Sequence, residues 1–191
     1  MKIVLATQNP GKIGEFKELA KGTQINFIKL EDEELCFPEE SGTSFRENAF
    51  IKAKFIFKSL QIPVLADDSG LEVDFLEGKP GVLTARFAGE NCSYMDNVNK
   101  MLKVLKNVQN SHRGAIFKTV MVFYDGKREL FSEGIVKGII AKKKKGLAGF
   151  GYDPIFYVVE EGKTFAEMTI EKKNIISHRG RAIKNLMPKL T

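Results

Sequence analysis

Two adjacent aspartates, Asp67 and Asp68, follow the short apolar run 64–66 and come directly before Ser69. A carboxylate beside a hydrophobic core is costly unless a cation, a metal ion or a proton compensates its charge. The alternative is an ordinary Asp-Ser-Gly turn that ends a strand with both carboxylates in water. The aspartate pair alone does not decide between a chemical site and a turn, so other segments have to.

A phosphate-binding pattern lies near the N-terminus, where the apolar run Lys2–Ala6 leads into residues 7–12, TQNPGK. Asn9 is a good helix N-cap, and Pro10 suits the first helical position because proline has no N–H to lose there. Free N–H groups at a helix N-terminus, with Lys12 beside them, suit a phosphate group. The spacing of a P-loop is absent, so this would be a different kind of phosphate site.

A third group of polar residues accompanies the helix expected over Ser44–Leu60. Asn48 and Lys52 are four residues apart and therefore share one face of that helix. The acids Glu39 and Glu40 come shortly before it. A few carboxylates, completed by water and phosphate oxygens, are what Mg²⁺ prefers, and lysines neutralise phosphate charge. Together these groups predict a nucleoside triphosphate site with a metal ion.

The elements that must position these groups alternate between strands and helices. Strands are expected over Lys2–Ala6, Gln24–Leu30, Pro63–Ala66 and Ile155–Val159, and an antiparallel hairpin over Ala115–Tyr124 and Glu129–Ile140 with an Asp125-Gly126 turn. Helices are expected from Pro10, from Ser44 with a Ser44/Glu47 capping box, from Ser93, and after Ser177. The pattern predicts an α/β protein with a mixed β-sheet flanked by helices. No linker divides residues 1–191, so we expect a single domain.

Composition and charge restrict the function classes. The 191 residues are 43% hydrophobic with a formal net charge of +6, which favours an anionic partner: nucleic acid, a membrane surface or a phosphorylated small molecule. No apolar run approaches the roughly 20 residues of a membrane span, and no secretory signal is evident. Cys36 and Cys92 fit neither a disulfide framework nor a zinc site. We expect a cytoplasmic protein whose Lys142–Lys145 run is a solvated loop.

Six segments, in this order, resemble the Ham1/RdgB inosine triphosphatase family. They are TQNPGK (7–12), EESGTSFRENAFIKA (39–53), ADDSGLEV (66–73), GKPGVLTARFAG (78–89), GFGYDPIF (149–156) and EKKNIISHRG (171–180). The resemblance spans nearly the whole chain, and the combination of ADDSG, GFGYDP and SHRG is highly specific. The lysines at 142–145 depart from the family pattern, which leaves the shape of that loop open.

The resemblance implies an activity. Proteins of this family are Mg²⁺-dependent pyrophosphatases that convert non-canonical purine nucleotides (ITP, dITP, XTP and dXTP) to the monophosphate and pyrophosphate, so clearing the nucleotide pool. It also implies two lobes around a nucleotide cleft, a homodimer, and no nucleic-acid or membrane partner.

The resemblance also implies residue roles. Asp68 would be the catalytic base and, with Glu40, a metal ligand, while Asp67 would support it. The substrate-binding residues would be Thr7, Gln8, Asn9, Pro10, Gly11, Lys12, Lys52, Ser69, Phe150, Gly151, Tyr152, Asp153, Lys173, His178 and Arg179. Phe150 would stack on the base, and Arg179, which can only donate hydrogen bonds, would select a 6-oxo purine over adenine.

Other interpretations remain open at this point. Taken alone, His178 at a helix start would be a structural residue, and Phe150 would be a core residue. A pyrophosphatase of related fold acting on modified or pyrimidine nucleotides, as in the Maf group, is the nearest alternative enzyme. A basic, non-catalytic nucleic-acid-binding protein is the alternative of another class, and it would not need the acids at 40, 67 and 68.

Overall fold

The computed structural model describes residues 1–30 and 37–190, so Cys36 and most of the acidic loop before Glu39 lie outside the described residues. The strands are β1 (Lys2–Leu5), β2 (Asn26–Lys29), β3 (Val64–Val73), β4 (Pro80–Gly81), β5 (Gly114–Tyr124), β6 (Glu129–Ile140), β7 (Phe156–Val158) and β8 (Lys163–Thr164). The α-helices are α1 (Pro10–Leu19), α2 (Phe45–Leu60), α3 (Tyr94–Val104), α4 (Ile170–Ile176) and α5 (His178–Leu186).

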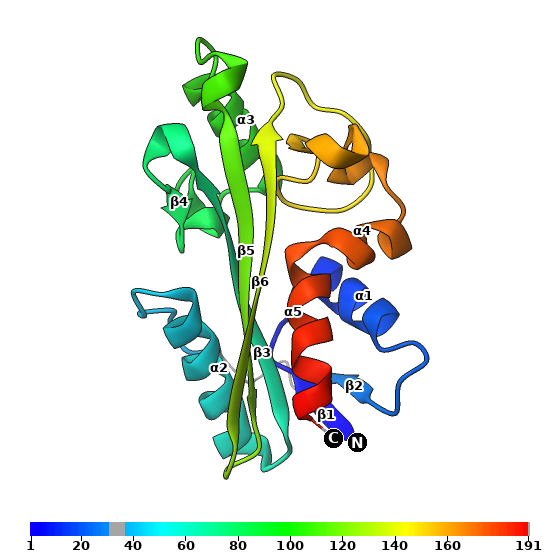
Figure 1. Cartoon of the computed structure of the whole chain (residues 1–191). Helices are drawn as coiled ribbons and strands as arrows, with labels where there is room; N and C mark the ends of the chain where they lie inside the picture. The colour runs from blue at the N-terminus through cyan, green and yellow to red at the C-terminus, as the bar shows by residue number, and fades with distance from the viewer. Residues whose placement is uncertain (31–36, 191) are drawn as a thin grey trace. The chain divides into compact units, whose positions relative to one another are not determined.

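The strands form one mixed sheet in the order β2-β1-β3-β5-β6-β7-β8, with β4 paired to β3 (Figure 1). β1 pairs in parallel with both β2 and β3. β4 pairs antiparallel with β3, and β7 pairs antiparallel with β6 and β8. β5 and β6 are sheet neighbours joined by a tight turn, in which Asp125 N donates to Arg128 O. The predicted α/β class with a mixed sheet and flanking helices is confirmed.

The chain forms two compact units, each built from several segments. Unit 1 comprises Met1–Asp68, Thr119–Gly134 and Arg179–Thr191, and unit 2 comprises Ser69–Lys118 and Ile135–His178. The expectation of one domain with two lobes stays a prediction.

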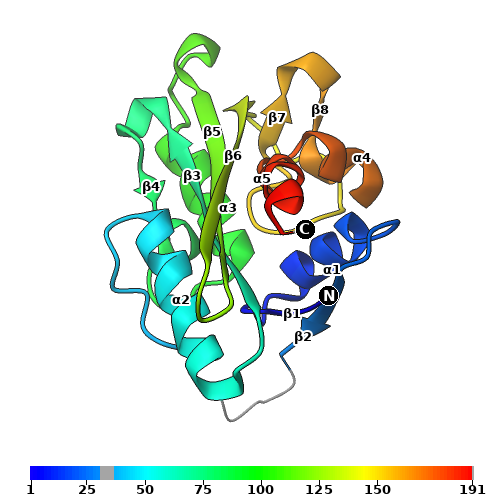
Figure 2. The same cartoon turned by 60° about the horizontal axis from the view of Figure 1, so that its bottom comes forward.

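In unit 1, α1 and α5 cover one face of the strands and α2 covers the other, as Figures 1 and 2 show. Phe16 of α1 and Ile183 of α5 share a hydrophobic cluster with residues of β1, β2 and β3. The predicted cap of α1 is confirmed, because the Asn9 side chain accepts from the backbone N–H groups of Gly11 and Lys12. This packing holds the end of β1 beside the start of α1, where Lys12 lies.

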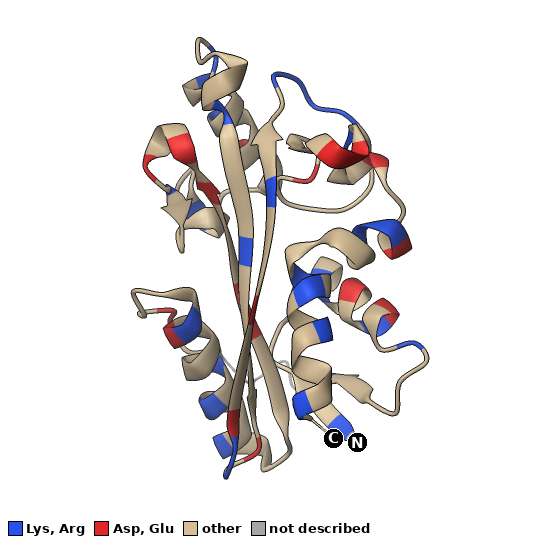
Figure 3. Ribbon diagram, in the orientation of Figure 1, with Lys and Arg blue, Asp and Glu red and all other residues tan. Residues whose placement is uncertain are grey.

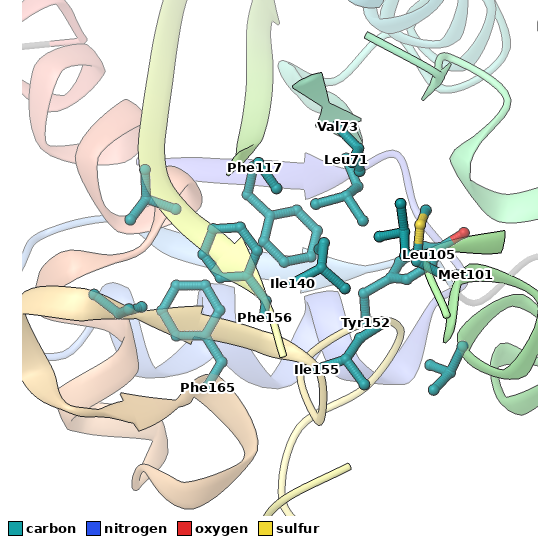
Figure 4. Packing of buried hydrophobic residues seen from close by; sticks show 14 of the residues in the cluster. Leu71, Val73, Met101, Leu105, Phe117, Ile140, Tyr152, Ile155, Phe156 and Phe165 are labelled. Atoms are coloured by element: carbon teal, nitrogen blue, oxygen red, sulfur yellow. The ribbon is translucent and has the colours of Figure 1, made fainter. Parts of the chain in front are cut away.

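Unit 2 has its own hydrophobic core, to which α3, β7 and the segment before β7 contribute (Figure 4). Met101 of α3, Phe156 of β7 and Tyr152 lie in it, and all three are buried. The predicted start of α3 is confirmed: Ser93 caps it, with Asp96 completing a reciprocal capping box. The core fixes α3 and the segment that carries residues 149–153.

Strand β3 differs from its prediction, because it continues through both aspartates to Val73 instead of ending at Ala66. The local sequence reads as a turn, but tertiary contacts satisfy the polar groups. Thr119 Oγ1 donates to the Asp68 carbonyl at 3.1 Å, and both aspartate side chains have partners in unit 1. The aspartates are therefore held rigidly within the sheet.

Two details of the helices differ from the prediction. The helix predicted from Ser44 is confirmed as α2, which the Ser44 side chain caps, but Glu47 accepts hydrogen bonds from Thr43, one residue earlier than in a Ser44/Glu47 capping box. The helix predicted after Ser177 is confirmed as α5, whereas α4, directly before it, was not predicted. Ser177 has an extended backbone (φ −67°, ψ 161°) that separates α4 from α5.

The surface carries the predicted lysine loop. Lys142–Lys145 are exposed and follow β6, where Figure 3 shows a continuous blue stretch. Within the described ranges, no helix has the length and apolar character that a membrane span requires.

Candidate functional site

The loop after β1 is closed by its own hydrogen bonds. Asn9 N donates to Thr7 Oγ1 at 3.2 Å, and Asn9 Oδ1 accepts from Gly11 N at 2.9 Å and Lys12 N at 3.3 Å. The sequence predicted that the first N–H groups of α1 would be open to a phosphate, and two of them are already held by Asn9. The group of this loop best suited to bind phosphate is therefore the Lys12 ammonium.

A buried row of alternating charges runs through unit 1. Lys12 Nζ lies 2.9 Å from Asp67 Oδ2, and Arg179 Nε donates to the same oxygen at 3.3 Å. The other side of the Arg179 guanidinium donates to Glu15. Burial raises the pKa of the Asp67 carboxyl, but the charges of Lys12 and Arg179 outweigh it and lower the pKa far below its usual range. Asp67 is therefore a permanent anion held by two cations.

This row bears on the role expected of Arg179. The resemblance implies that its guanidinium contacts the purine base, which stays a prediction, and in the structure the side chain is 2% exposed and bound by two carboxylates of its own unit. Burial lowers the pKa of Arg179, but attraction to Glu15 and Asp67 raises it by more, so the net shift is upward. In this arrangement Arg179 fixes Asp67 and, through β3, the neighbouring Asp68.

A second cluster brings Asp68, Glu40 and Lys52 together. Lys52 Nζ donates to Glu40 Oε1 and to the Asp67 carbonyl, both at 2.7 Å, and lies 3.9 Å from Asp68 Oδ1. Asn48 Nδ2 donates to Asp68 Oδ2 at 3.0 Å. The face shared by Asn48 and Lys52 on α2 thus meets the β3 carboxylate, as their spacing indicated.

The electrostatics of this cluster differ between its members. Burial raises the pKa of the Asp68 carboxyl, the charge of Lys52 opposes that shift, and the charge of Glu40 adds to it, so the net shift is upward. Burial lowers the pKa of Lys52, but attraction to Asp68, Glu40 and Asp67 reverses the shift. A carboxyl with a raised pKa is a better proton acceptor than an ordinary aspartate.

The donor set of this cluster fits a hard divalent cation. In the described part of the chain, no group of three or more His, Cys, Asp or Glu side chains is arranged to hold a metal ion. Glu40 and Asp68, which both lie beside Lys52 Nζ, offer two carboxylates, and this matches Mg²⁺, which commonly takes one or two carboxylates and completes its shell with water and substrate phosphates. Asp67, held by Lys12 and Arg179, is not part of this set.

The predicted base-binding segment Phe150–Asp153 of unit 2 lies on the loop between β6 and β7, residues 141–155, here called the glycine loop. Asp153 Oδ2 accepts from Phe150 N at 2.9 Å and from Lys173 Nζ at 2.5 Å. A Cβ on Gly149 would lie 2.0 Å from the same oxygen, so only glycine fits there. Lys173 Nζ also lies 4.9 Å from the centre of the Phe150 ring. The structure thus brings Phe150, Asp153 and Lys173 together.

Two other predicted base contacts are largely enclosed. The Tyr152 side chain packs in the core of unit 2 and donates to the Thr84 carbonyl at 3.1 Å, and burial raises its pKa. The Tyr152 side chain therefore supports the glycine loop from beneath. The His178 ring, 4% exposed, stacks on Phe117 with ring centres 4.9 Å apart and planes at 10°.

The other predicted substrate-binding residues are described by their exposure. Gln8 and Pro10 are exposed in the loop before α1, and Gly11, Ser69 and Gly151 are half-buried. They stay predictions that rest on the resemblance.

Sequence reasoning missed several partners. Glu15 is three residues after Lys12 and so on the same face of α1, a spacing that could have revealed it. Thr119, which donates to the Asp68 carbonyl, and Phe117, under His178, lie on β5. Neither has a local signal, because strand pairing brings them to their partners.

Comparisons with known proteins show the family and the fold. The Ham1 family matches residues 3–189. A dITP/XTP pyrophosphatase of a Thermoanaerobacter species is 45% identical over 190 residues, covering 97% of this chain and 94% of that protein. The structure of a HAM1 protein from Coxiella burnetii is 40% identical, with a TM-score of 0.88 and coverage of 100% and 98%. The Staphylococcus aureus Ham1 protein is 42% identical, with a TM-score of 0.86 and the same coverage.

Proposed function

Because the chain belongs to the Ham1 family, we propose that it hydrolyses non-canonical purine nucleoside triphosphates such as dITP, ITP and XTP to the monophosphate and pyrophosphate. The name dITP/XTP pyrophosphatase of its relative supports the substrate class. The observation that carries the proposal is the Asp68–Glu40–Lys52 cluster, which combines two carboxylates and a buried cation. A homodimer in the cytoplasm remains a prediction from the resemblance.

The phosphate chemistry is assigned to residues of unit 1. Lys12 and Lys52 supply positive charge for the triphosphate oxygens, since a lysine acts as a compact point charge toward phosphate. Glu40 and Asp68 would hold Mg²⁺, which when bound neutralises phosphate charge and acidifies a water ligand. Asn48 and Lys52 keep Asp68 oriented by hydrogen bonding and charge.

In the proposed reaction, Asp68 takes a proton from the attacking water. The new bond joins the water oxygen to the α-phosphorus, the bond from that phosphorus to the bridging oxygen breaks, and pyrophosphate leaves. Burial and the nearby Glu40 raise the pKa of Asp68 in the metal-free protein, and a water acidified by the bound metal would lose its proton more readily to this carboxylate. General-base help of this kind contributes about 10²–10⁴-fold in rate.

Base recognition is assigned to the glycine loop and its partners in unit 2. Phe150 offers a ring for stacking, which is worth about 1–3 kcal/mol on nucleic-acid bases. Lys173 can only donate hydrogen bonds, so it suits the 6-oxo group of hypoxanthine or xanthine and opposes the 6-amino group of adenine. Lys173 and Arg179 are both buried and held by carboxylates, and we prefer Lys173 as the donor to the base because its Nζ lies 4.9 Å from the centre of the Phe150 ring.

A panel of nucleotides tests the proposal. We expect fast, Mg²⁺-dependent release of pyrophosphate from dITP, ITP and XTP, and kcat/KM for ATP lower by at least about 10²-fold, because a site that pairs with a 6-oxo group leaves adenine's amino group badly matched. The measurement is coupled pyrophosphate detection, with inorganic phosphate measured in parallel. Equal rates on ATP and dITP, or phosphate as the first product, would contradict the proposal.

The same panel separates the alternatives. A related pyrophosphatase with another substrate class would prefer modified or pyrimidine triphosphates to dITP. A nucleic-acid-binding protein would release no pyrophosphate and would bind DNA or RNA with an affinity that falls steeply with salt.

A further inference from the structure

The Phe150 ring projects from a residue that lies between two glycines. Gly149 and Gly151 flank it with φ of +76° and +61°, in the left-handed region that favours glycine. Its backbone N–H is fixed by Asp153, but that bond does not set the direction of the ring. The orientation of the ring must therefore come from side chains of other elements.

The side chains of Lys173 and Tyr94 lie against the ring. Lys173 Nζ lies 4.9 Å from its centre, and the Tyr94 ring lies 6.0 Å away, centre to centre, with the planes tilted by 46°. This spacing is within the range of favourable aromatic pairs. Tyr94 is the first residue of α3, directly after the Ser93 cap, so its backbone is well fixed.

Further contacts tie α3 to the glycine loop. In the middle of α3, Asn99 Oδ1 lies 3.4 Å from Nζ of Lys144, a residue of that loop. Beyond the end of α3, the Arg113 guanidinium, which is 1% exposed, donates to the carbonyls of Leu105 at 2.5 Å and of Ala141, the first residue of the loop, at 3.1 Å. Because α3 and the loop are joined in both places, Tyr94 is held at a fixed place relative to Phe150.

We propose that Tyr94 is a positioning residue for purine recognition, whose ring holds Phe150 in the orientation that stacks on the base. The inference rests on the proposed function and adds to it a residue that has no role in the family pattern described above. The inference also assigns a role to Lys144 of the lysine loop, because its contact with Asn99 connects α3 to the loop that carries Phe150.

The first experiment measures dITP hydrolysis by Tyr94→Ala and Tyr94→Phe. Tyr94→Ala is expected to raise KM for dITP roughly 3- to 10-fold, the effect of losing one aromatic pair. Its kcat should stay within about twofold, because stacking stabilises the bound substrate and the transition state alike. Tyr94→Phe keeps the ring and should behave as wild type. Val104→Ala, an exposed apolar residue about 15 Å along the same helix, serves as the matched control.

A double-mutant cycle with Phe150→Ala tests whether Tyr94 acts through Phe150. If it does, adding Tyr94→Ala to the Phe150→Ala variant should change KM by less than about twofold, because the ring to be positioned is gone. A general structural effect of Tyr94→Ala would instead multiply with that of Phe150→Ala and would also lower kcat.

The outcomes separate the two proposals. Suppose that the wild-type protein hydrolyses dITP, but that KM is unchanged in Tyr94→Ala or that the effects of the two substitutions multiply in the cycle. Either result overturns the role of Tyr94 and leaves the proposed function intact. A wild-type protein that neither binds nor hydrolyses dITP overturns both.

Discussion

Asp68→Asn is expected to lower kcat for dITP by about 10²–10⁴-fold, the usual contribution of a general base. Asparagine keeps the shape of the side chain and can still accept the hydrogen bond from Asn48, but it cannot take a proton from water. Steady-state pyrophosphate release measures the loss. Glu39→Gln, which changes an exposed acid beside Glu40, is the control and should retain wild-type turnover.

The same variant should fold at least as stably as the wild type when no divalent metal is present. The pKa of Asp68 is raised above its unfolded value by burial and by Glu40. The folded state therefore binds this proton more tightly than the unfolded chain, and ionising Asp68 above its folded pKa costs stability. The neutral amide of the Asp68→Asn variant would remove that cost, so its melting temperature at neutral pH should be equal or higher. A melting temperature well below that of the wild type would mean that the loss of activity reflects misfolding.

Arg179→Met is expected to destabilise the protein by about 3–5 kcal/mol, because it removes the cation between two buried carboxylates. For a chain of this size, that corresponds to a fall of roughly 6–20 °C in melting temperature. Glu15 and Asp67 are both nearly fully buried, so neither gains solvation in exchange. Urea unfolding of the whole chain measures the free energy directly.

A second variant and a pH series distinguish this account from simple loss of packing. Arg179→Met with Glu15→Gln should recover part of the lost stability, because one of the two buried charges is then neutral. The lowered pKa of Asp67 gives stability that is present above its unfolded value of about 3.9 and is lost as pH falls below it. The difference between wild type and Arg179→Met should therefore shrink in acid. A difference that is constant with pH, with no recovery in the double variant, would contradict the account.

Local signals predicted much of the frame that positions these residues. In the caps of α1 and α3, the side chains of Asn9 and Ser93 accept hydrogen bonds from backbone N–H groups two or three residues further on. The local sequence therefore contains the whole interaction. The Asn48 and Lys52 face was readable for the same reason, because the helical period places both residues on one side.

The interactions that the sequence did not reveal join residues that are far apart in the chain. The partners Glu15 and Arg179 are 164 residues apart in the chain, and no local pattern joins them. Without Glu15, Arg179 reads as an available donor, so nothing in the sequence indicated the ion pairs beside the base contact that the resemblance implies. The continuation of β3 through the aspartates likewise depends on Lys12, Asn48 and Thr119. Contacts distant in sequence override local turn propensity.

The central claim is that Glu40 and Asp68 together hold a divalent ion on the phosphate chain of the nucleotide. Electron paramagnetic resonance of Mn²⁺, titrated with a non-hydrolysable dITP analogue present, measures that ion directly. The account predicts tight Mn²⁺ binding by the wild type and an affinity at least about tenfold weaker in both Glu40→Gln and Asp68→Asn, since a lost ligand should cost no less than a lost supporting contact. Equal Mn²⁺ affinity in all three proteins would contradict it.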